Sequence, residues 1–71
     1  MSKTTIVRYC GKRTTAYAER VNTWDHERRD YSAQRIAVRV YDGVAGHYVE
    51  AHSLTHGQRR YVIARTLPKA A

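Results

Sequence analysis

Apolar and polar residues alternate with a period of two along much of this chain, whereas the 3.6-residue period of an amphipathic helix does not recur. Five runs rich in Val, Ile, Thr and Tyr therefore predict β-strands, because these side chains suit a pleated, half-buried surface. The predicted strands are residues 3–10, 13–21, 34–41, 47–54 and 59–67.

Turn residues separate most of these runs. Gly11 can take the positive φ of a tight reversal, and the stretches "DGVAG" (42–46) and "THGQ" (55–58) predict two more reversals. Pro68 ends the last run, since proline cannot donate to a sheet ladder, and residues 68–71 are expected to be frayed.

Segment 22–33, "NTWDHERRDYSA", has two interpretations. One is a short helix with Trp24, Arg28 and Tyr31 on one face. The other, which we favour, is a loop "DHERRD" that closes a long hairpin, with Trp24 and Tyr31 as a cross-strand aromatic pair. Twelve residues of mixed charge are too few for a helix that must form without support.

The pattern as a whole predicts an all-β fold, or a β-rich fold with one short helix. The strands would form a five-stranded antiparallel meander, either closed as a small barrel of the SH3 or OB type or left as an open sheet. A length of 71 residues allows a single domain, 1–71. So short a chain has a marginal core, and pairing as a homodimer would supplement it.

Charge adds the first indication of function. Thirteen Lys and Arg stand against six Asp and Glu, which gives a net charge of +7. Ten of the bases are Arg, whose planar fork suits phosphate groups and stacks on aromatic planes. The two halves, 1–35 and 36–71, both carry an excess of bases. We therefore expect a polyanion as partner, with a footprint on the folded surface.

One predicted strand face carries both charge and an aromatic ring. By parity, Arg35, Arg39 and Tyr41 share a face opposite the core residues of strand 34–41. Exposed aromatic rings on a sheet stack on unpaired bases while neighbouring Arg holds the backbone. Tyr17 and Trp24 are further candidates for stacking.

Three basic doublets fall at the predicted strand junctions: Lys12-Arg13, Arg28-Arg29 and Arg59-Arg60. In a meander, alternate connections lie at the same end of the sheet. We therefore expect the second and fourth connections, with Arg28, Arg29, Arg59 and Arg60, to converge on a phosphate-sized site.

These features predict a small nucleic-acid-binding protein. The alternative is an inhibitor or adaptor, phage- or mobile-element-encoded and of the anti-CRISPR kind, that docks on a host protein or nucleoprotein complex. Its hot spots would be the same Arg and Tyr residues, because interface cores favour both types. Composition does not separate the two hypotheses.

Catalysis and metal binding have weaker support. Glu50 and His52 share a predicted strand face, which is the minimum for acid–base cleavage of RNA. The spacing of the four histidines and the single Cys10 matches no metal motif, and we predict neither a metal nor a cofactor. A lone cysteine and the lack of an apolar span favour a cytoplasmic protein without membrane contact.

Overall fold

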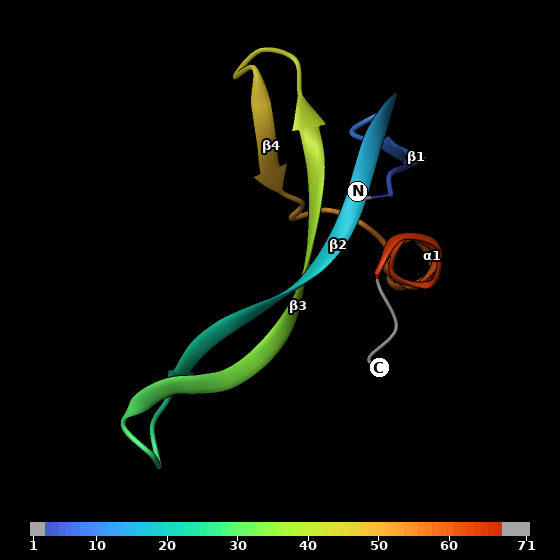
Figure 1. Cartoon of the computed structure of the whole chain (residues 1–71). Coiled ribbons are helices and arrows are strands. Elements are labelled where there is room, and N and C mark those ends of the chain that lie inside the picture. Colours follow the sequence, from blue (N-terminus) through green and yellow to red (C-terminus); the bar gives the residue numbers. More distant parts are fainter. Residues whose placement is uncertain (1–2, 68–71) are drawn as a thin grey trace.

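A computed structural model describes residues 3–67 as one open, four-stranded antiparallel sheet with a single helix packed on one face (Figure 1). The strands follow one another in chain order across the sheet. The elements are β1 (Thr5–Tyr9), β2 (Lys12–Asp25), β3 (Asp30–Asp42), β4 (His47–Glu50) and α1 (His56–Thr66). The β-rich prediction is therefore confirmed. The fifth strand and the barrel are not, and the predicted fraying of 68–71 lies outside the described residues.

The predicted strand 59–67 is wrong, because residues 59–66 belong to α1 and Leu67 is its C-cap. The segment 55–58 is not a reversal but a capping box. The Thr55 hydroxyl accepts a hydrogen bond from the Gln58 backbone N–H (3.1 Å), and the Gln58 side chain accepts one from the Thr55 N–H (3.0 Å). These two bonds satisfy N–H groups that a helix start leaves without partners. Leu67 ends the helix in an extended conformation, as expected of a residue before proline.

The hairpin interpretation of segment 22–33 is confirmed. β2 and β3 run through it as one long ribbon that turns at residues 26–29 (Figure 1). The rings of Trp24 and Tyr31 pack edge to face, with centroids 5.2 Å apart. Asp25 organises the turn, because its Oδ1 accepts the backbone N–H groups of Glu27 and Arg28.

The face of the sheet that carries α1, here called the covered face, holds the core. Small residues line β2 at this face: Ala16 is fully buried and Ala18 is 3% exposed. Their size lets the helix approach β2 closely, so that Val62 packs against Val38 and Val40. Each of these three valines is at most 1% exposed.

Thr66 fastens the end of α1 to the sheet. β1 pairs with β2 only as far as Thr5 opposite Ala16, so the N–H of Ala18 lies beyond the reach of that strand. The buried Thr66 hydroxyl accepts from this N–H (2.7 Å) and donates to the Val62 carbonyl (2.7 Å). A helix side chain thereby continues the hydrogen bonding of β2 where its neighbouring strand stops.

Candidate functional site

The face of the sheet opposite α1, here called the open face, carries the predicted stripe. The register of β2 and β3 pairs Tyr17 with Arg39, and that of β3 and β4 pairs Tyr41 with Tyr48. Arg35, Arg39 and Tyr41 do share this face, as predicted. Two of the tyrosines join Tyr41 in an edge-to-face cluster, with centroids of 5.0 Å for Tyr17–Tyr48 and 5.4 Å for Tyr41–Tyr48.

Both arginines of the stripe already hold carboxylates. Arg35 forms a two-pronged bond with Glu50, with both N–O distances 3.0 Å. The Nε of Arg39 donates to Glu19 at 2.7 Å. These four long side chains lie around Ala37, which is fully buried although it faces away from the helix. A phosphate on this face would therefore have to compete with carboxylates that are already in place.

The Arg35–Glu50 pair also affects ionisation. The hydrogen bond from Arg35 is the main cause that lowers the pKa of Glu50 below its usual range, and the charges of Arg39 and His52 act in the same direction. The hydrogen bond to Glu50 in turn raises the pKa of Arg35. Glu50 is thus held as a carboxylate bound to Arg35. That is unfavourable for a general base, whose pKa should lie near the working pH, and it weakens the case for RNA cleavage by Glu50 and His52.

The predicted convergence of the basic connections is wrong. It depended on a fifth strand, and α1 starts where that strand was expected. The Arg59 side chain donates to the Ile36 carbonyl (3.4 Å), which lies opposite Arg20 on β2. Asp25, just before the hairpin turn, lies about 16 Å farther along β2 than Arg20. Figure 1 accordingly shows the β2–β3 turn well away from α1.

The β2–β3 turn is not basic as a whole. Arg28 and Arg29 lie in it together with Asp25, Glu27 and Asp30, so carboxylates outnumber guanidinium groups there. These two predicted phosphate ligands are both exposed, but they are separated from the other predicted site residues.

The net positive charge comes from two stretches that contain no acid. Residues 1–18 have four Lys and Arg, and residues 51–71 have another four, with no Asp or Glu in either stretch. Residues 19–50 hold all six acids against five bases. The even balance of the two sequence halves conceals this distribution, because each half mixes an acid-free stretch with part of the acidic middle.

The fold brings together β1 and α1, which belong to these two stretches. α1 lies alongside β1 (Figure 1). Near the start of the helix, the Gln58 side-chain amide donates to the Arg8 carbonyl (2.8 Å). Near its end, Arg65 lines a shallow hollow together with Lys3, Thr4 and Thr5. We call the exposed bases at this β1 edge of the molecule the basic flank: Lys3, Arg8, Lys12, Arg13, Arg60 and Arg65. Strand alternation directs Arg8 and Arg13 to the open face, whereas Arg60 and Arg65 lie on α1.

Within the basic flank, Arg8 and Arg13 lie directly opposite each other on β1 and β2. Like charges at such paired positions destabilise a sheet. A pair of exposed guanidinium groups in this position is therefore suited to an anion that bridges them. On the outer side of α1, the Arg65 guanidinium stacks over the Tyr61 ring, 5.1 Å from its centroid.

Of the predicted site residues, the structure places Lys12, Arg13 and Arg60 at the β1 edge of the molecule. Arg35, Arg39 and Tyr41 lie on the open face, to which strand alternation also directs Arg13. The place of Arg8, Arg65 and Lys3 on the basic flank was not predicted. The signal for them was in the sequence, in the absence of Asp and Glu before Glu19 and after Glu50.

Within residues 3–67, no group of three or more His, Cys, Asp or Glu side chains is arranged to hold a metal ion. The one helix in this range is neither long nor apolar enough to cross a membrane. Comparison with known protein families, curated proteins and solved structures finds no match for this chain.

Proposed function

We propose that this protein binds nucleic acid, led by phosphate contacts to the basic flank. The observation that carries the proposal is the packing of α1 beside β1, which brings the described parts of the two acid-free stretches together at the β1 edge of the molecule. These two stretches contribute cations and no carboxylates. A cluster of cations of this kind suits a polyanion with regularly spaced charges. Arg35 and Arg39 have a secondary role, because Glu50 and Glu19 already bind them.

Salt dependence tests the proposal directly. Each phosphate contact that displaces counterions contributes about −0.7 to −0.9 to the slope of log K against log salt concentration. A flank that engages four or so phosphates gives a slope of about −3. Fluorescence anisotropy with a labelled oligonucleotide between low and physiological salt measures this slope, and a flat dependence would overturn the proposal.

Paired variants locate the contact. Replacing Arg8 and Arg13 by Gln removes two charges of the flank and relieves their mutual repulsion, so the fold is retained. We expect the slope to become less steep by about 1.5. The matched control replaces Arg28 and Arg29 by Gln, which changes the net charge equally at the hairpin turn. Equal losses of affinity from the two double variants would contradict a site on the flank.

A protein partner is the second candidate, and the open face is the observation that favours it. Its tyrosine cluster (Tyr17, Tyr41 and Tyr48) lies beside charge-neutral Arg–Glu pairs, and Tyr41 is 43% exposed. Exposed Tyr and Arg on a rigid surface are typical hot-spot residues. Affinity capture after nuclease treatment tests this candidate. A stoichiometric protein kept by the wild type and lost with Tyr41→Ser supports it, and a preparation with no retained protein overturns it.

A further inference from the structure

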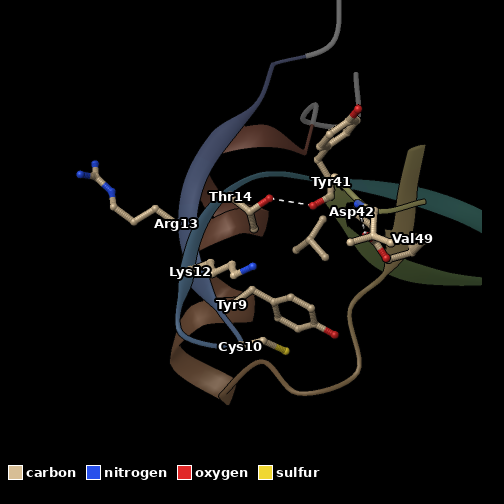
Figure 2. A pocket seen from close by; sticks show the side chains of 11 residues that line it. Tyr9, Cys10, Lys12, Arg13, Thr14, Tyr41, Asp42 and Val49 are labelled. Atoms are coloured by element: carbon tan, nitrogen blue, oxygen red, sulfur yellow. Dashed lines mark hydrogen bonds between the residues drawn. The ribbon is translucent and has the colours of Figure 1, made fainter. Parts of the chain in front are cut away.

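A pocket of about 530 Å³ opens at one end of the sheet, and residues of the β1–β2 and β3–β4 turns contribute to its lining (Figure 2). This volume lies within the range of roughly 300–1,000 Å³ that is usual for small-ligand sites. Tyr9, Val40 and Val49 form the apolar part of its lining, and Lys12 and Asp42 bring charge to it. Its lining therefore combines a flat ring, aliphatic groups and two opposite charges.

The aromatic wall is held in place. The Tyr9 hydroxyl accepts a hydrogen bond from the backbone N–H of His52 (3.1 Å), which orients the ring from its far end. Val40 is 1% exposed and belongs to the core, so the pocket floor is part of the rigid body of the sheet. A planar ring of the size of a nucleobase can pack against Tyr9 here, since aromatic stacking tolerates any base.

The charged groups of the pocket suit the phosphate of a nucleotide and the amino group of its base. Figure 2 shows the Lys12 ammonium directed toward the pocket and the Arg13 side chain directed away from it. Asp42 accepts the backbone N–H groups of Val44 (2.9 Å) and Ala45 (3.1 Å). These bonds, and more weakly the charges of His47 and Lys12, lower the pKa of Asp42 and keep it ionised as an acceptor for a base amino group.

We propose that the nucleic acid bound by this protein is single-stranded, with one unpaired base in the pocket and the flanking phosphates on Lys12 and Arg13. This inference rests on the proposed function, and it adds the class of nucleic acid and the position of one base. The pocket adjoins the basic flank, since Lys12 and Arg13 belong to both. A base paired in a duplex has neither its ring faces nor its edge available for such a pocket.

A comparison of two single strands tests the inference. One is a labelled deoxyoligonucleotide of mixed sequence, and the other has the same length but abasic sites throughout its centre. Phosphate contacts are the same in both, so only the base contact differs. We expect the intact strand to bind the wild-type protein about tenfold more tightly at equal salt. We also expect it to slow alkylation of Cys10, the single cysteine, which is exposed on the pocket lining.

A filled pocket provides the matching variant. Gly43 lines the pocket, and a Cβ added there would meet no heavy atom within 4 Å. Gly43→Trp should bind both strands with the affinity that the wild type has for the abasic strand. Ala45→Trp is the control, because Ala45 lies in the same turn but is not among the residues that line the pocket. It should keep the tenfold preference.

The outcomes separate the two proposals. If neither strand binds the wild type, the proposed function itself fails. If both strands bind equally and neither protects Cys10, phosphate-led binding stands and the pocket inference is overturned. Should Gly43→Trp fail to fold, the wild-type comparison of the two strands and the alkylation rates still decide the question.

Discussion

The two faces of the β2–β3–β4 sheet are built from alternate residues of the same strands, yet different interactions stabilise them. On the covered face, Ala16, Val38 and Val40 are buried against α1. On the open face, tyrosine rings pack edge to face, and Arg35 and Arg39 hold carboxylates. Packing and a buried hydrogen bond stabilise the covered face, whereas ring contacts and ion pairs at the surface stabilise the open face. Substitutions on the covered side should therefore alter stability most, and those on the open face should alter it less.

The largest effect is expected from Thr66→Val on the covered side. The substitution keeps the side-chain volume but removes the acceptor for the Ala18 N–H, which then remains buried without a partner. A donor left in this state costs about 2 kcal/mol of unfolding free energy. Urea denaturation followed by circular dichroism measures the loss.

Thr66→Ser is the matched control, since it keeps the hydroxyl and removes one methyl group. It should be less destabilised than Thr66→Val. The reverse order would show that packing of the Thr66 methyl group, rather than its bond to Ala18, joins the helix to the sheet.

The same contrast explains what the sequence could predict. The alternation in residues 34–41 correctly separated the two faces of β3, because a strand side-chain period of two is a local property. The alternation in 59–67 was misleading. β-branched and aromatic residues such as Tyr61, Val62 and Ile63 resemble a strand, and the helical signals were the Thr55–Gln58 capping box and the spacing of Val62 and Thr66. Tertiary packing, rather than propensity, makes this short segment helical.

The candidate site was less accessible to sequence reasoning for a different reason. Whether a guanidinium is available depends on which carboxylate the register brings to it. Arg39 meets Glu19 across 20 positions of chain, and Arg35 meets Glu50 across 15. Turn lengths and strand register decide these partners, and alternation alone does not specify them.

A smaller effect is expected on the open face, and its pH dependence identifies it. Arg35 lowers the pKa of Glu50 in the folded protein, so the unfolded chain takes up a proton first as the pH falls. The stabilisation is therefore present above the ordinary glutamate pKa of about 4.3, and it is lost as the pH drops through the lower folded value. Glu50→Gln should be less stable than the wild type at pH 7, by less than Thr66→Val, because the pair is exposed.

Thermal melting at pH 7 and near pH 3 measures this difference. The gap between Glu50→Gln and the wild type should narrow on the acid side. The wild type and the variant both retain Asp42, whose pKa is also lowered, so its contribution cancels in the comparison. A gap that is the same at both pH values would show that Glu50 stabilises the open face by packing and not by its charge.

The smallest effect is expected at the β1–β2 turn, which belongs to neither face. Cys10 and Gly11 take positive φ values of 52° and 77°, as in the two-residue hairpin turns that favour Asn-Gly. A left-handed conformation strains a cysteine, whereas asparagine tolerates it. Cys10→Asn should therefore raise the unfolding free energy by about 0.5 kcal/mol, measured by urea denaturation under reducing conditions.

Cys10→Ala is the control, because it removes the thiol without relieving the backbone strain. A gain of the same size from alanine would attribute the effect to loss of the thiol, and only a gain specific to asparagine supports relief of strain at the turn.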